Sequence, residues 1–152
     1  MSLIRSGLVA YRATGAELWM HHYIALLAGA CEIAGQDGEA LSLLEDALRT
    51  ADRTGQRWLA AELCRRKGQL LLRQGHSAAA EELYRKALSI AVEQEAKLWE
   101  LRAAVSFARR RRDQGRRAEA HDLLAPIYTW FTEGFDTPDL KDARALLETL
   151  YP

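Results

Sequence analysis

The segment that decides the fold is Gly68–Ala91, which reads GQLLLRQGHSAAAEELYRKALSIA. Leucine and alanine recur on both sides of Gly75 at spacings of three and four, the spacing of one apolar face of an α-helix. Glycine is typical of the position just beyond a helix C-terminus, and Ser77 is a suitable N-cap for a following helix. The segment therefore predicts two helices joined by a tight turn at Gly75.

The same pattern occurs three times, at a period of 40 residues. The matched positions are Gly35, Gly75 and Gly115, then Ala40, Ala80 and Ala120, then Leu44, Tyr84 and Leu124, while Trp19, Trp58 and Trp99 open the three units. Short turns make consecutive helices antiparallel, and a helix pair that cannot bury its apolar face alone must stack on the next pair. We therefore expect an all-α superhelical solenoid of antiparallel helix pairs, in which the tryptophans are packing residues.

The whole chain, 1–152, is expected to be one domain. Its helices are predicted at 16–34, 37–54, 56–74, 77–95, 97–114, 117–133 and 138–150, with repeats at 16–54, 56–95 and 97–134. Residues 138–150 form a capping helix that starts at Thr137 and Pro138, and Pro126 should bend the helix before it without breaking it. Residues 1–14 match the second helix of a preceding repeat, so we expect a piece of a longer protein whose uncovered N-terminal end favours self-association.

Composition supports an all-helical chain, since 26 Ala and 24 Leu stand against 3 Val, 5 Ile and 7 Thr. The net charge is 0, which excludes attraction of the whole chain to nucleic acid or to an anionic membrane. The longest uncharged stretch, Leu18–Cys31, is too short to span a bilayer, and we find no signal peptide. We therefore expect a cytoplasmic protein without a membrane partner, in which Cys31 and Cys64 are buried structural residues.

The spacing of Gly68, Ala80, Tyr84 and Ala87 resembles the small, small, aromatic and small positions of the tetratricopeptide repeat, although that repeat has a period of about 34 residues. The segments YRATGAELW at 11–19 and LWELRAAVSFARRRRDQGRRAEAHDLLAPIYTWFTEGFDTPDLKDARALL at 98–147 are similar to the C-terminal repeat region of bacterial multidomain signalling proteins. There a class III adenylate/guanylate cyclase or a transcriptional-regulator domain precedes an ATPase module. The resemblance implies a regulatory, protein-binding segment whose parent carries the chemistry.

If the tetratricopeptide register carries over, the first helices of the repeats line a groove. Its expected lining is His22, Glu32, Glu62, Arg65, Gln69, Arg73, Arg102, Arg109, Arg112 and Asp113, a net basic set. We expect it to bind an acidic or C-terminal carboxylate segment from a partner protein or from other domains of the parent chain. The predicted partner-binding residues are Arg65, Gln69, Arg73, Arg102, Arg109 and Arg112.

The densest charge cluster is Arg109–Arg117, which contains six arginines around the turn at Gly115. Cations at a helix C-terminus interact favourably with the helix dipole, so a structural role is the first interpretation. An acidic protein partner and nucleic acid remain alternatives, and nucleic acid is the less favoured one. His21 and His22 are adjacent and cannot share a metal ion on one helix face, and no P-loop or catalytic set is found, so we expect no metal, cofactor or catalysis.

Overall fold

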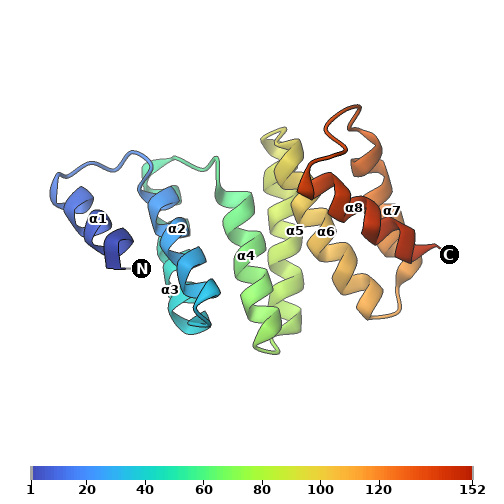
Figure 1. Ribbon diagram of the computed structural model, residues 1–152, viewed down its shortest axis with the longest axis horizontal. Coiled ribbons are helices and arrows are strands. Elements are labelled where there is room, and N and C mark those ends of the chain that lie inside the picture. Colours follow the sequence, from blue (N-terminus) through green and yellow to red (C-terminus); the bar gives the residue numbers. More distant parts are fainter. Residues whose placement is uncertain (1, 152) are drawn as a thin grey trace.

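The computed structural model describes residues 2–151, so Met1 and Pro152 of the expected domain lie outside the described part. These residues form eight α-helices and no β-strand, which confirms the all-α prediction. The helices are α1 (Ser2–Ala13), α2 (Met20–Ile33), α3 (Asp37–Thr54), α4 (Ala60–Arg73), α5 (Ser77–Glu93), α6 (Lys97–Asp113), α7 (Arg117–Thr129) and α8 (Pro138–Leu150). Figure 1 shows them standing in a row, with α1 at one end of the array and the α7–α8 pair at the other.

Each helix packs mainly on its neighbours along the chain, and the strongest contacts are those of α2 with α3, α4 with α5 and α6 with α7. Two further contacts link the even-numbered helices α4 to α6 and α6 to α8. The main contact of α1 is with α2, and no extensive contact joins the first helices to the last ones within residues 2–151. The array is therefore an open stack and not a closed bundle. Its apolar core runs along the stack as four neighbouring clusters, and Cys31 and Cys64 are buried in two different clusters.

The turn glycines lie where the sequence predicts them. Gly35, Gly75 and Gly115 have φ values of 72°, 86° and 79°, in the left-handed region that residues with a Cβ disfavour. At the first of these turns the Gly35 N–H donates to the Glu32 carbonyl oxygen at 3.1 Å, and the Gln36 N–H donates to the Cys31 carbonyl oxygen at 2.8 Å. These bonds satisfy carbonyl groups at the end of α2, as a glycine-terminated helix requires.

One predicted N-cap and three predicted helix ends lie elsewhere in the structure. The N-cap of α5 is His76, and Ser77 is the first helical residue and makes no capping bond. The helices expected at 16–34 and 56–74 begin at Met20 and Ala60, because tight turns precede them in which their N–H groups donate to Glu17 and Arg57 at 3.1 and 2.9 Å. The helix expected to reach residue 133 ends at Thr129, although it continues through Pro126 as predicted.

Because α2 begins at Met20 and α4 at Ala60, two of the tryptophans lie outside the helices in which they were expected. Trp19 and Trp58 lie in the turns, remain partly exposed, and meet edge to face with ring centroids 5.1 Å apart. Trp99 lies inside α6 and packs on two of the core clusters. The expectation of three equivalent packing tryptophans therefore holds in full for Trp99 alone.

The residues of the tetratricopeptide-like spacing meet where α4 crosses α5. Tyr84 is buried, and a Cβ added to Gly68 would lie 2.8 Å from its Cε1 atom and 3.2 Å from the Ala80 carbonyl oxygen. No side chain larger than hydrogen fits there without movement of α5. The absence of a side chain at Gly68 therefore sets the distance between the two helices of the central pair.

The capping helix α8 closes the C-terminal end of the core. It buries Leu140, Ala143, Leu146 and Leu150 in a cluster against which Tyr128 and Phe131 also pack. Its opposite side is exposed and polar, and Arg144 donates to Glu148 there at 2.9 Å. Trp130 and Phe135 stay largely exposed beside it.

Replacing Gly68 by alanine is expected to lower the free energy of unfolding by about 1–3 kcal/mol, because overpacking against Tyr84 outweighs the better helix propensity of alanine. The matched control is Gly38→Ala in α3, where an added Cβ meets no atom within 4 Å. That change should raise the free energy of unfolding, by up to ~1 kcal/mol. Urea denaturation followed by circular dichroism measures both, and equal effects of the two substitutions would contradict the close approach.

The side chain of His21 is buried without a hydrogen-bond partner, among the described residues, for either of its ring nitrogens. It is fully buried at the start of α2, and its ring lies 5.2 Å from that of Trp58. Burial lowers the pKa of His21, and the neighbouring His22 lowers this pKa further. The folded protein therefore holds His21 neutral at pH values where the unfolded chain binds a proton.

Because the unfolded chain then binds more protons, the free energy of unfolding should fall as the pH drops through the ordinary histidine value of about 6.5. His21→Leu should therefore make the free energy of unfolding less dependent on pH between pH 7 and pH 5. Chemical denaturation at a series of pH values measures this. A slope that survives His21→Leu would show that another group is responsible.

Candidate functional site

Three of the predicted binding residues meet at one pocket. Arg65 of α4 and Arg102 and Arg109 of α6 line a cavity of about 180 Å³, together with Leu101, Val105, Ser106, Asp139 and Asp142. The stacking of α4, α6 and α8 produces this convergence, since each helix supplies polar side chains to the pocket. We call this cavity the arginine pocket.

The inner wall of the arginine pocket is fixed by Arg65. Its guanidinium makes two bonds to Glu62 one turn earlier, with Nε–Oε2 and Nη2–Oε1 distances of 2.7 and 2.6 Å. Its Nη1 also donates to the Ser106 hydroxyl at 3.3 Å, and the side-chain amide of Gln69 donates to the same oxygen at 3.4 Å. The side chains of Arg65 and Glu62 are only 16% and 11% exposed, so this pair is held in place and shielded from water.

Arg102 links α6 to α8. It donates through Nε and Nη2 to the two carboxylate oxygens of Asp139, both at 2.8 Å, in the bidentate geometry that gives arginine pairs their strength. The guanidinium also lies over the Trp99 ring, 5.0 Å from its centroid. The pKa of Arg102 is raised, chiefly by its hydrogen bond to Asp139, so the group keeps its charge.

Arg109 is the most accessible of the three arginines. It pairs with Asp142 of α8, and the two side chains are 41% and 48% exposed. Water screens such a pair, and its net contribution to stability is about 0–1 kcal/mol. An incoming carboxylate can therefore replace Asp142 at Arg109 at small cost.

The other predicted binding residues lie apart from this pocket or at its edge. Gln69 reaches it only through Ser106. Arg73 turns toward the first unit, where it pairs with Asp37 at 3.1 Å and Glu32 at 3.7 Å. Arg112 pairs with its neighbour Asp113. The six residues thus do not form one continuous surface.

The expectation of a net basic groove is corrected by the last helix. Asp139 and Asp142 place two carboxylates among the three arginines, and Glu62 supplies a third. The sequence analysis assigned α8 only a capping role and did not identify Asp139 and Asp142 as partners of the arginines. The available signal was the spacing of three between the two aspartates in its first turns, which puts both on one helix face.

The arginine cluster around Gly115 is also compensated. Five of its six members pair with carboxylates: Arg109 with Asp142, Arg110 with Glu81, Arg111 and Arg116 with Glu119, and Arg112 with Asp113. Arg111 in addition lies over the Phe107 ring at 4.4 Å. These contacts support the structural interpretation of the cluster, because they join α6 to α5, α7 and α8 through Glu81, Glu119 and Asp142.

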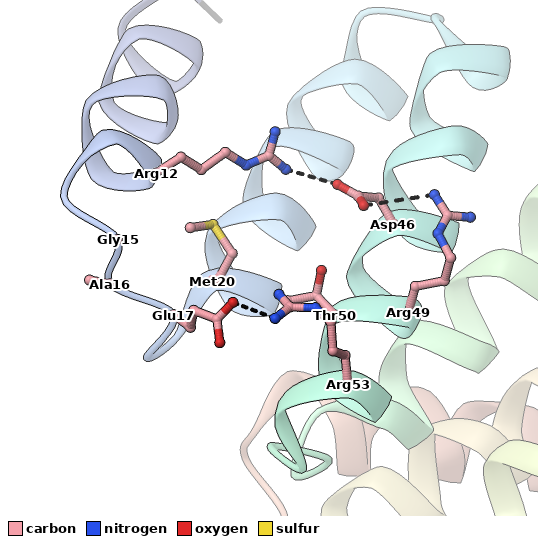
Figure 2. A pocket seen from close by; sticks show the side chains of 9 residues that line it. All are labelled: Arg12, Gly15, Ala16, Glu17, Met20, Asp46, Arg49, Thr50 and Arg53. Carbon is pink, nitrogen blue, oxygen red and sulfur yellow. Dashed lines mark hydrogen bonds and ion pairs between the residues drawn. The ribbon is translucent and has the colours of Figure 1, made fainter.

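A larger and wider pocket lies between α1 and α3, with a volume of about 620 Å³ (Figure 2). Figure 2 shows Arg12 reaching across to Asp46, at 2.8 Å, while Arg49 approaches the same carboxylate at 3.7 Å. Arg53 pairs with Glu17 at the lower rim. Arginines pair with both carboxylates of this pocket, and the pair of Arg12 with Asp46 ties α1 to α3.

Comparison with models of known protein families gives no match, and no curated protein sequence matches the chain. Within residues 2–151, no group of three or more His, Cys, Asp or Glu side chains is placed to hold a metal ion. In the same part of the chain, no helix combines the length and the apolar character that a membrane crossing needs.

Glu62→Gln is expected to lower the free energy of unfolding by about 1–3 kcal/mol, because it leaves the shielded Arg65 charge without its carboxylate. Glu148→Gln breaks the exposed pair with Arg144, a pair within one helix as well, and should cost less than about 1 kcal/mol. Urea denaturation compares the two variants. If both changes cost the same, Arg65 is not fixed by Glu62.

Proposed function

We propose that this chain is a tetratricopeptide-like superhelix that binds an acidic peptide segment and performs no chemistry itself. The segment belongs to a partner protein or to another domain of a longer bacterial signalling protein, where the repeat has a regulatory role. The observation that carries the proposal is the convergence of Arg65, Arg102 and Arg109 from two stacked helices on one pocket.

The superhelical part of this proposal is supported by repeated local geometry. Left-handed glycines follow α2, α4 and α6, and α6 contacts the even-numbered helices α4 and α8 as well as its sequence neighbours. The tight crossing of Gly68 and Tyr84 agrees with the small and aromatic positions of a tetratricopeptide pair. The signalling context rests on the sequence resemblance alone.

The arrangement suggests how a carboxylate would bind. Arg65 is held by Glu62 and Ser106, and it presents a fixed wall. Arg109 shares an exposed pair with Asp142, so this guanidinium is the one that can exchange partners. A peptide carboxylate that takes the place of Asp142 would gain a charge-assisted bond inside a preformed cavity.

This mechanism predicts opposite effects of two substitutions on the binding of a fluorescein-labelled octaglutamate peptide. Asp142→Asn removes the competing carboxylate and should tighten binding severalfold, whereas Arg109→Gln should weaken it about tenfold or more. Fluorescence anisotropy at low salt measures both affinities. An octaglutamine peptide, which has the same length but no carboxylate, measures the binding that does not depend on charge. Both side chains are about half exposed, so the fold should be retained.

The matched control is Arg144→Gln, which removes the same charge from the outer side of α8, where Arg144 is exposed. It should leave the affinity nearly unchanged. Equal weakening by Arg144→Gln and Arg109→Gln would mean that the peptide senses only overall charge, and no binding to the Asp142→Asn variant would end the proposal. Tighter binding of random duplex DNA than of octaglutamate would favour the nucleic-acid alternative.

A further inference from the structure

The tryptophans of the chain lie along one edge of the helical array. Figure 1 shows the connections α1–α2, α3–α4, α5–α6 and α7–α8 along this edge, at the top of the view, and the glycine turns at the opposite edge. The N-cap of α2, the turn before α4, the first turn of α6 and the C-cap of α7 each carry one, namely Trp19, Trp58, Trp99 and Trp130.

Two of these tryptophans line an open pocket in the middle of the array. The pocket lies between the α3–α4 turn and the start of α6, and its volume is about 620 Å³. Its lining consists of residues 55–58 together with Gln94, Ala96 and Trp99. Further helices flank it on both sides, so neither end of the chain forms it, and it shares no residue with the arginine pocket. We call this cavity the tryptophan pocket.

The polar side chains of the tryptophan pocket offer mainly hydrogen-bond donors. Gln56 accepts the backbone N–H of Trp19 through Oε1 at 3.1 Å, which leaves its amide nitrogen to donate. Arg57 pairs with Asp52 at 3.2 Å, and these side chains are 50% and 66% exposed. The exception is Gln94, because its Nε2 already donates to the Arg57 carbonyl oxygen at 2.9 Å. The two indole N–H groups of the lining are donors only.

No carboxylate is among the described residues that line the tryptophan pocket. A ligand that fits must therefore bring apolar surface to the indole rings and acceptors to the donors. Proline meets both requirements, because it has an apolar ring and a backbone carbonyl oxygen but no N–H. A proline-rich segment also adopts the polyproline II conformation before it binds, and aromatic-lined grooves bind such segments.

The spacing of the repeats matches the spacing of such a segment. Trp58 lies two residues before α4, and Trp99 is the third residue of α6. The helices α4 and α6 contact each other directly, so their axes are about 8–10 Å apart. A polyproline II helix advances by about 9 Å over one turn of three residues. Prolines three residues apart therefore match the step from one tryptophan to the next.

We propose that the tryptophan pocket binds a proline-rich segment of a partner protein, with proline at every third position. A second copy of this chain does not supply the segment, because Pro126, Pro138 and Pro152 are its three prolines and lie at least 12 residues apart. Single-stranded nucleic acid also stacks on tryptophan, but it needs a basic path for its phosphates. The lining has one cation, Arg57, and Asp52 pairs with it.

The test uses fluorescein-labelled decaproline, which adopts the polyproline II conformation, and a Gly-Ser peptide of equal length. Decaproline should bind saturably in fluorescence anisotropy, and the Gly-Ser peptide should not. Trp58→Ala should raise the dissociation constant for decaproline about tenfold or more. The matched control is Trp130→Ala, at an exposed tryptophan of the same edge outside the pocket, and it should have no effect.

A second variant leaves the aromatic contacts in place, since Trp58 also packs on the rings of Trp19 and His21. Ala96→Glu adds bulk and a carboxylate to the lining that contains Arg57, and it should weaken decaproline binding to a similar extent. Circular dichroism of each variant measures whether the helices are retained.

The spacing is tested with two peptides of equal length and composition, in which four prolines are separated either by two serines or by three. The peptide with proline at every third position should bind severalfold more tightly, because only its prolines keep step with the repeats.

Four results would overturn the proposal. They are the absence of saturable decaproline binding up to about 1 mM, equal weakening by Trp130→Ala and Ala96→Glu, equal affinity of the two spaced peptides, and tighter binding of oligothymidylate than of decaproline. The last result would identify single-stranded nucleic acid as the ligand.

Discussion

The close contact between Gly68 and the Tyr84 ring is the constraint on which the rest of the array depends. Because α4 has no side chain at this point, α5 lies close enough for Tyr84 to be buried between the units. Phe107 of α6 then packs on Tyr84, with ring centroids 6.1 Å apart. The missing Cβ of Gly68 thus sets the distance between α4 and α5. The contact of Tyr84 with Phe107 then fixes the position of α6 relative to this pair.

This spacing also decides which polar groups meet. Successive even-numbered helices lie close enough for their side chains to bond directly, as Arg66 does to Glu32 and Arg102 does to Asp139. These bonds join residues 34 and 37 positions apart, about one repeat. The arginine pocket is therefore a product of repeat stacking, and a change in helix spacing would separate Arg65 from Ser106 before it altered either helix.

The all-α class and the three glycine turns were predictable because they depend on local rules: helical spacing of apolar residues and the need for positive φ after a helix. Glu95 shows the limit of such rules, since it adopts a φ of 52° at a turn where no glycine marks the position. The ion pairs of Arg102 and Arg109 with the aspartates of α8 were not predictable from the sequence pattern of either helix alone. It depends on how α8 rotates about its axis when Leu140 and Leu146 enter the core.

The two ends of the array differ in a way that bears on how it binds. In a stack whose units contact only their neighbours, stability is a sum of local terms, and a ligand acts mainly on the unit it touches. The helix α1 is held by its contact with α2 and by exposed ion pairs to α3, whereas α8 brings four buried side chains to a core cluster. Opening of the structure should therefore begin at α1. The arginine pocket, which α4, α6 and α8 build, should keep its geometry when α1 opens, because α1 contributes no residue to it.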